Sequence, residues 1–194
     1  MLHTTKNTAR ILLASAALTS FALPALAADT YTLDPMHTAV TWHLNHFGFS
    51  NPSGKFMNAD GVGVLDQENP AASKVNITIP VAAIDSGVPK LDEHLKSKDF
   101  FDVEAFPTAS FVSTKVEVTG ENTAIVHGNL TLHGVTKPVD LDVKLNKLGE
   151  NMMNKETAGF SATAMIKRSD FGIVMYLPAL SDDVRLDIEV EANK

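Results

Sequence analysis

Residues 92–99 bring together the side-chain types that acid–base and nucleophilic chemistry use. Asp92, His94, Ser97 and Asp99 all lie in this stretch. A histidine paired with a carboxylate can act as a general acid or base. A Ser–His–Asp triad depends on geometry rather than on closeness in sequence, and the chain has no G-x-S-x-G motif. We therefore interpret the aspartates as caps of turns, and keep an enzyme using His94 with Asp92 or Asp99 as an alternative.

Histidines are the other side chains that could do chemistry, as metal ligands. None of them forms a recognised metal motif such as H-E-x-x-H, and the chain has no cysteine. His43 and His46 are three residues apart, so on one strand they would face opposite sides. We therefore expect no metal site and no cofactor. Hydrogen-bonded or exposed positions are expected instead for the six histidines beyond residue 27, which are His37, His43, His46, His94, His127 and His133.

Residues 1–27 have the organisation of a secretory signal peptide. Two basic residues precede the apolar run 11–22, and Ala25-Leu26-Ala27 is typical of a cleavage site. The run is about 12 residues long, whereas a membrane-spanning helix needs roughly 20. We therefore expect cleavage after Ala27, a periplasmic location, and one mature domain over residues 28–194 with no transmembrane segment.

The charge of the chain argues against nucleic acid as a partner. The chain has 16 basic and 23 acidic residues, a net charge of −7, and loss of Lys6 and Arg10 with the signal would leave 14 basic residues and a net charge of −9. An acidic domain has no basic surface with which to displace the counterions of a phosphate backbone. The same sign disfavours adsorption to anionic membranes.

Alternating apolar and polar residues dominate the rest of the chain and predict an all-β fold. Val139, Leu141 and Val143, for example, alternate with Asp140 and Asp142. Such runs suit antiparallel strands with one buried face. His133-Gly134 is typical of a hairpin turn. The predicted strands are 38–47, 54–65, 73–84, 108–118, 122–133, 137–147, 157–168 and 182–192.

The connection over residues 88–107 differs from the strands. Leu91 and Leu95 are four residues apart, and Phe100, Val103 and Phe106 follow at intervals of three. These spacings predict one or two short helices, the second of which would end before the proline at position 107. We expect them to pack over one end of the sheet.

Eight antiparallel strands can form either a closed barrel or a sandwich. A closed barrel removes both exposed edges and can hold one small ligand. Which outcome follows depends on the inward side chains. Small residues on the apolar faces leave room for a cavity unless neighbouring phenylalanines fill it, and these residues are Ala124, Gly128, Ala158, Ala162 and Ala164. From the residues alone, the two outcomes stay open.

Four segments resemble the YceI-like family of periplasmic proteins, which bind polyisoprenoids in a lipocalin-like barrel. The match runs in order through the mature chain. Its two longest segments, 91–103 and 128–139, are the most specific. The turn 86–90 departs from the family's more polar pattern. The four segments read LDPMHTAV at 33–40 with HFGFS at 46–50, LDEHLKSKDFFDV at 91–103, GNLTLHGVTKPV at 128–139, and RSDFG at 168–172.

The resemblance implies an eight-stranded antiparallel lipocalin-like barrel that carries a long apolar chain and performs no catalysis. The ligand would be a polyprenyl chain, a quinone tail or a similar amphiphile. Trp42 is the strongest candidate contact, because an aromatic ring offers a large apolar surface, and His94 could bind a headgroup. The predicted ligand-binding residues are Val40, Trp42, Leu44, Phe56, Val75, Ile77, Ile79, Val126, Leu130, Phe160 and His94.

Two other functions remain as alternatives. One is an enzyme that acts on a lipid or quinone through His94 and Asp92 or Asp99, which requires a titrating pair inside the cavity. The other is an accessory module with a filled core. A homodimer is also expected to be possible, since an apolar barrel mouth tends to be covered.

Overall fold

The computed structural model describes residues 28–194, so the expected signal peptide lies outside the described residues. Long alternating runs form antiparallel strands, and short 3-10 turns join some of them. The strands are β1 (Asp29–Leu33), β2 (Ala39–His43), β3 (Ser53–Phe56), β4 (Asp60–Leu65), β5 (Lys74–Pro80), β6 (Ile84–Asp85), β7 (Thr108–Gly120), β8 (Thr123–Leu132), β9 (Val135–Glu150), β10 (Glu156–Lys167) and β11 (Asp183–Asn193); the α-helix is α1 (Pro89–Lys96), and the 3-10 turns are η1 (Pro70–Ala72), η2 (Val81–Ala83) and η3 (Arg168–Phe171).

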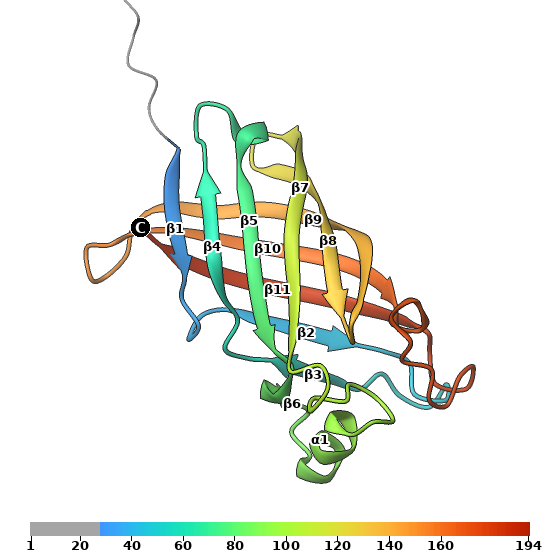
Figure 1. Ribbon diagram of the computed structural model, residues 1–194. Helices are drawn as coiled ribbons and strands as arrows, with labels where there is room; N and C mark the ends of the chain where they lie inside the picture. Colours follow the sequence, from blue (N-terminus) through green and yellow to red (C-terminus); the bar gives the residue numbers. More distant parts are fainter. Residues whose placement is uncertain (1–27) are drawn as a thin grey trace, which may run out of the picture.

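Eight of the strands close into an antiparallel barrel, which confirms the predicted fold class (Figure 1). Around the ring they follow the order β1, β4, β5, β7, β8, β9, β10, β11. The barrel closes where β1 pairs with the end of β11, through Thr32 opposite Asn193 and Leu33 opposite Ala192. The two-residue turn His133-Gly134 between β8 and β9 has positive φ at both residues, as a type I′ hairpin requires.

The ring does not consist of the eight strands that were predicted. β1 was not predicted, although Tyr31 and Leu33 alternate with exposed threonines and point inward. β2 lies beyond β1 along the same edge of β11, and β3 and β6 extend this part of the sheet. The predicted strand 54–65 is divided between β3 and β4, because the backbone turns at Asn58, whose φ is 60°. Likewise η2 separates β5 from β6 within the predicted strand 73–84.

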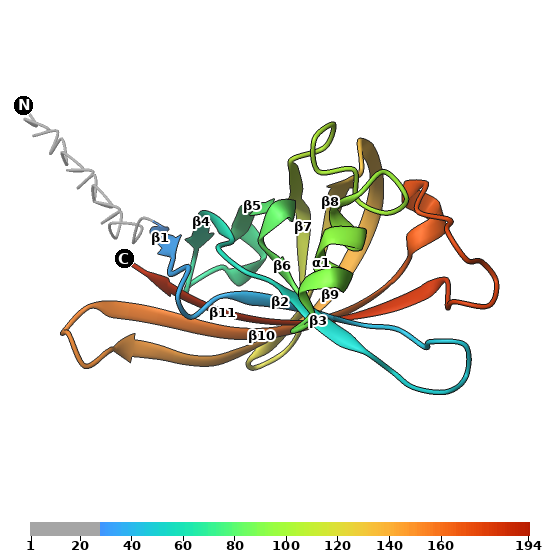
Figure 2. The same ribbon diagram turned by 90° about the horizontal axis from the view of Figure 1, so that it is seen from below.

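The helix α1 covers one end of the barrel, as predicted for residues 88–107 (Figures 1 and 2). Pro89 suits its first turn, because the missing N–H has no partner there. Leu95 points inward and is 8% exposed. Residues 97–106 form successive turns rather than the second helix that was considered possible. In these turns the Asp102 N–H donates to the Ser97 carbonyl at 2.9 Å.

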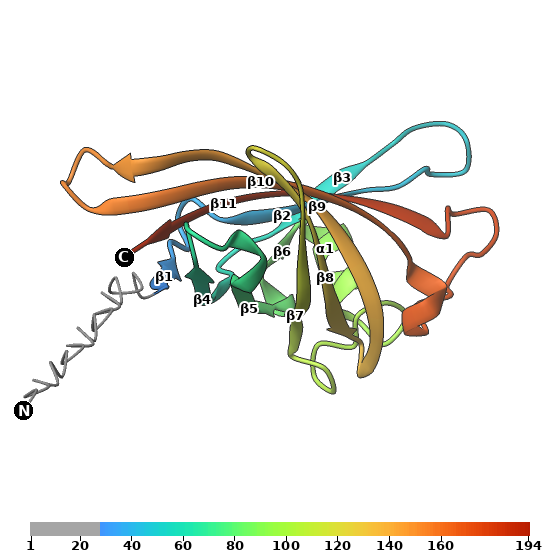
Figure 3. The ribbon, with the colours of Figure 1, turned by 90° about the horizontal axis from the view of Figure 1, so that it is seen from above.

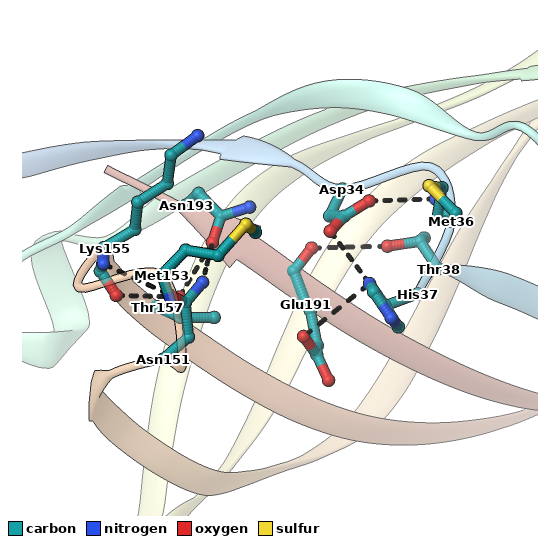
Figure 4. A network of polar contacts seen from close by, with 10 residues as sticks. All are labelled: Asp34, Met36, His37, Thr38, Asn151, Met153, Lys155, Thr157, Glu191 and Asn193. Carbon is teal, nitrogen blue, oxygen red and sulfur yellow. Dashed lines mark hydrogen bonds and ion pairs between the residues drawn. The ribbon is translucent and has the colours of Figure 1, made fainter.

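A polar network holds the corner at which the chain passes from β1 to β2 (Figure 4). The Glu191 carbonyl on β11 accepts hydrogen bonds from the Asp34 N–H at 2.8 Å and from the buried Thr38 hydroxyl at 3.3 Å. Within the turn, Asp34 Oδ1 accepts from the Met36 N–H at 2.9 Å. These bonds satisfy the backbone of the corner and align both strands on β11.

The interior of the barrel is filled at one end. A small cluster of Tyr31, Leu33, Ala59, Ala158 and Ala192 packs there, and none of these residues is more than 5% exposed. The Tyr31 hydroxyl donates to Glu156 Oε1 at 2.6 Å, and burial together with this carboxylate raises the pKa of Tyr31. A larger apolar cluster occupies the other end, under α1. At this end of the barrel, small residues such as Ala158 leave no cavity, because the large Tyr31 side chain packs against them.

Gly54 allows Trp42 to lie flat against β3. A Cβ at position 54 would come within 2.8 Å of both the Asp85 carbonyl oxygen and Trp42 Cε2. We expect Gly54→Ala to lower the free energy of unfolding by about 1–3 kcal/mol, because backbone at this contact must shift. Urea denaturation measures the change. Gly63→Ala in β4 is the matched control, since its nearest new contact is 3.8 Å away; an equal loss in both variants would contradict the steric explanation.

Candidate functional site

A cavity of about 350 Å³ lies in the end of the barrel that α1 covers. Side chains from β2, β3, β5, β7, β8, β10 and β11 form its walls, and side chains from α1 and from the loops 44–52, 97–107 and 172–182 complete the lining. The lining is almost entirely apolar. It consists of Val40, Trp42, Leu44, His46, Phe47, Pro52, Phe56, Ile79, Val81, Leu91, His94, Leu95, Phe100, Phe101, Ala109, Leu130, Leu132, Ile166, Arg168, Ile173, Tyr176, Leu180, Val184 and Leu186.

Aromatic rings gather where α1 meets the loop that follows η3. The Phe100 ring lies edge-on to His94, with centroids 5.0 Å apart, and Tyr176 lies 6.3 Å from Phe100 and 6.4 Å from His94. Phe101 packs edge-on against Phe56 of β3 at 5.3 Å. These rings form stiff apolar walls at the end of the cavity next to α1, while His94 and Tyr176 also carry polar atoms.

Within residues 28–194, Arg168 is the only charged residue of the lining apart from two histidines, and it is 4% exposed. Its guanidinium donates to three backbone carbonyls: Nε to Ser181 at 2.8 Å, Nη1 to Ile173 at 3.0 Å and Nη2 to Leu180 at 3.1 Å. Burial lowers the pKa of Arg168, an effect that Asp182 opposes. The ordinary pKa of an arginine is so high that the guanidinium remains charged at neutral pH. Arg168 therefore holds the loop over the cavity.

The structure brings together most of the predicted ligand-binding residues. Val40, Trp42, Leu44, Phe56, Ile79, Leu130 and His94 all line the cavity. Four others lie elsewhere in the barrel. Val75 and Val126 belong to the surrounding apolar cluster without lining the cavity, and Ile77 and Phe160 pack against the filled end. Phe160 also borders a shallow polar groove on the β9–β10 side. Strand alternation identified the inward face of these residues, but not their height along the barrel.

Several lining residues were missed because they lie outside the strands. Phe100, Phe101, Tyr176 and Leu180 come from turns and loops, where no alternation marks the inward side chains. One signal was available in the sequence. The loop 172–181 has no charged residue, which is unusual for a surface connection.

The groups that the enzyme alternative requires are not assembled inside the cavity. Asp92 does not line it; instead its Oδ1 accepts from the Ser86 N–H at 2.8 Å and from the Ser86 hydroxyl at 2.5 Å. These bonds lower the pKa of Asp92 and secure the turn before α1. His94 Nε2 lies 3.3 Å from Asp99 Oδ2, but the Asp99 side chain is 52% exposed. Asp92 therefore serves a turn, as interpreted from the sequence, whereas the exposed Asp99 carboxylate contacts His94.

Among the described residues, Asp34, His37 and Glu191 form one group with the composition of a metal site (Figure 4). Their ligand atoms lie within 4.8 Å of one another. However, His37 Nδ1 and Asp34 Oδ2 are 2.8 Å apart. Two ligands of a tetrahedral zinc ion are separated by roughly 3.4 Å, given bonds near 2.1 Å. The geometry is therefore that of a hydrogen-bonded ion pair.

This pair predicts a measurable titration. The Asp34 hydrogen bond raises the pKa of His37 above 6.5, and the same bond lowers the pKa of Asp34 below 3.8. Its stabilising effect is therefore complete between these two values. It is lost as the pH rises through the folded pKa of His37, or falls through that of Asp34. NMR titration should show the midpoint of the His37 titration above pH 6.5. In Asp34→Asn the midpoint should fall back toward 6.5, and in Glu191→Gln it should fall by less. An unshifted midpoint in the unmodified protein would contradict the pairing.

The fold and the cavity together place the protein among the small antiparallel barrels that enclose an apolar ligand-sized space. The chain belongs to the YceI-like family, because the family model of the YceI-like domain matches residues 31–192. The resemblance seen in the sequence is thus confirmed. A UPF0312 protein of Pseudomonas putida (strain W619) is 42% identical over 172 residues, which cover 88% of each chain.

Solved structures have the same fold. Burkholderia cenocepacia BcnA superposes with a TM-score of 0.75 and 24% identity, covering 82% of this chain and 98% of BcnA. A polyisoprenoid binding domain from Saccharophagus degradans, implicated in plant cell wall breakdown, superposes with a TM-score of 0.66 and 14% identity. That match covers 87% of this chain and 99% of the domain. At these identities, the likeness concerns the fold.

Over residues 28–194, no helix combines the length and the apolar character that crossing a bilayer requires.

Proposed function

We propose that the protein binds a long-chain isoprenoid-type lipid, such as a polyprenyl chain or a quinone tail, in the barrel cavity and carries it through the periplasm. The observation that carries this proposal is the apolar cavity itself. Packed side chains close the barrel at one end of this cavity, and loops border it at the other end. The name of the S. degradans domain supports the ligand class, since that domain shares the fold.

The lining favours a hydrocarbon chain over a polar ligand. The one fully charged lining group, Arg168, already donates to three carbonyls. Each buried CH₂ contributes roughly 0.8 kcal/mol, so about ten buried carbons contribute several kcal/mol before ordering costs are subtracted. The stiff double bonds of a prenyl chain lose less rotamer freedom than a saturated chain.

The orientation of the ligand follows from the two ends of the barrel. The end near Tyr31 is packed with side chains, so a chain enters from the mouth with its tail first. Its headgroup then lies beside His46, His94 and Tyr176. The cavity of about 350 Å³ is at the lower end of the usual range for small-molecule sites, roughly 300–1,000 Å³. A long polyprenyl chain would therefore be held in part, with the remainder at the mouth.

Extraction of the native protein tests this function. The protein is expressed with its own N-terminus, purified without detergent and extracted with organic solvent, and the extract is analysed by mass spectrometry. We expect about one equivalent of a prenyl lipid or similar amphiphile. Absence of lipid, together with no binding of added farnesol, would overturn the proposal.

The periplasmic part of the proposal has a separate test. Osmotic shock fluid should contain the protein, and N-terminal sequencing should begin at Ala28. Retention of the intact N-terminus in the cytoplasmic fraction would refute export without affecting lipid binding.

A further inference from the structure

Two of the loops that line the cavity, residues 44–52 and 172–181, contain no Asp, Glu, Lys or Arg. Charged residues make up 20% of the chain, so loops of this combined length would ordinarily hold about four. Surface connections are normally polar, because they face water. We call these two segments the mouth loops.

The mouth loops form one surface. The Ser181 N–H donates to the Asn45 carbonyl at 3.0 Å, and His46 pairs with Leu180 in an isolated bridge. The Phe47 and Tyr176 rings lie 6.5 Å apart. Both loops project from the same side of the barrel, beyond the ends of β2 and β10 (Figures 2 and 3). They therefore act together rather than as two separate tips.

This surface exposes four large apolar side chains, of which Phe49 and Val174 do not line the cavity. Phe49 is 92% exposed, Val174 57%, Tyr176 51% and Phe47 41%. Phe47 and Tyr176 also have positive φ, 54° and 62°, a conformation that favours glycine or asparagine. Positive φ is unfavourable for these two aromatic residues, and so is exposure of their rings to water. Exposed apolar side chains that are retained in spite of this indicate an apolar partner.

We propose that the mouth loops dock on the surface of a phospholipid bilayer, so that the cavity opens against the membrane. The inference deepens the proposed function, since a membrane is where a prenyl lipid resides. Phenylalanine and tyrosine suit the boundary between headgroups and acyl chains. Because the mouth loops have no charged side chain, their insertion costs no desolvation of charge.

The charge of the protein selects the kind of bilayer. The chain has a net charge of −7, and −9 once residues 1–27 are removed as proposed, so the protein is repelled by anionic headgroups. Docking therefore depends on apolar contact, and a zwitterionic surface is preferred. The absence of charged side chains from the mouth loops also distinguishes them from a protein–protein interface, whose rim is polar and whose contacts often include arginine.

The experiment measures sedimentation of the protein with vesicles of phosphatidylcholine, and with vesicles that also contain phosphatidylglycerol. The test variant is Phe49→Ser with Val174→Ser, since neither residue lines the cavity. We expect the double variant to bind phosphatidylcholine vesicles at least tenfold more weakly. Met152→Ser is the matched control, because Met152 is fully exposed on the turn between β9 and β10 and should have no effect. Adding phosphatidylglycerol should weaken binding.

Binding of farnesol in solution separates this proposal from the proposed function. The double variant should bind farnesol as the unmodified protein does, but take prenyl lipid from vesicles more slowly. No vesicle binding by the unmodified protein, or equal binding by the double variant, would overturn docking, even if farnesol binds. A dimer in analytical ultracentrifugation that the double variant abolishes would assign the surface to a second copy instead. Vesicle binding without farnesol binding would support docking and refute the ligand.

Discussion

Ala109→Trp should remove at least nine-tenths of prenyl-ligand binding and leave the barrel folded. Ala109 lies on β7, opposite Ile79 of β5, and its small side chain lines the cavity while being 5% exposed. An indole at this position would occupy part of the cavity of about 350 Å³. Because the ring is flat and mostly apolar, it would stay buried in the apolar cavity. Filling a void usually preserves or raises stability.

The measurement is farnesol affinity by fluorescence competition, accompanied by circular dichroism and thermal unfolding. Met165→Trp is the matched control, because Met165 lies on the outer face of β10 and is 61% exposed. It adds the same indole without entering the cavity. Full binding by a folded Ala109→Trp protein would show that the ligand is held somewhere else.

Arg168→Met should have the largest effect on stability, a loss of about 3–5 kcal/mol in the free energy of unfolding. The substitution keeps a long apolar stem but leaves the carbonyls of Ile173, Leu180 and Ser181 without their donor. Each buried acceptor that loses its partner costs about 1–3 kcal/mol, and water reaching the loosened loop recovers part of this. Arg168→Lys should be intermediate, since one ammonium cannot reach three separated carbonyls.

Urea denaturation measures the stability, and hydrogen exchange of residues 173–181 locates the effect. Arg185→Met is the matched control, because Arg185 pairs with Asp187 on the exposed outer face and is expected to change stability by no more than about 1 kcal/mol. A loss below about 1 kcal/mol for Arg168→Met, with exchange in the loop unchanged, would show that the buried guanidinium does not hold the mouth.

The predicted effects depend on which face of a strand a side chain occupies and on where along the barrel it lies. The sequence indicates only the first of these. Leu130 and Trp42, which were predicted to face the interior, line the cavity, because alternation along a strand determines which face a side chain occupies. Val126 has the same parity as Leu130, yet it does not line the cavity. Alternation carries no information about where along the barrel a space begins. That depends on bulky residues such as Tyr31 at the other end.

The closure of the barrel shows the same limit. Eight antiparallel strands were predicted, but the pairing of β1 with the end of β11 joins residues separated by most of the chain. The alternation within Asp29–Leu33 is present in the sequence, although an alternation of only five residues is a weak pattern. Which strand closes the ring is decided by the corner at Asp34 and Thr38, whose hydrogen bonds to Glu191 align β1 and β2 on one edge.

The amino-acid sequence by itself determined the class of fold, the inward faces of the long strands and the family, because these depend on local alternation and on contiguous motifs. Only the tertiary structure decided that one end is packed and the other hollow, that Arg168 ties down a loop, and that the uncharged loops meet at the mouth. Each of these features requires contacts between segments far apart in the chain, and side-chain periodicity does not encode such contacts.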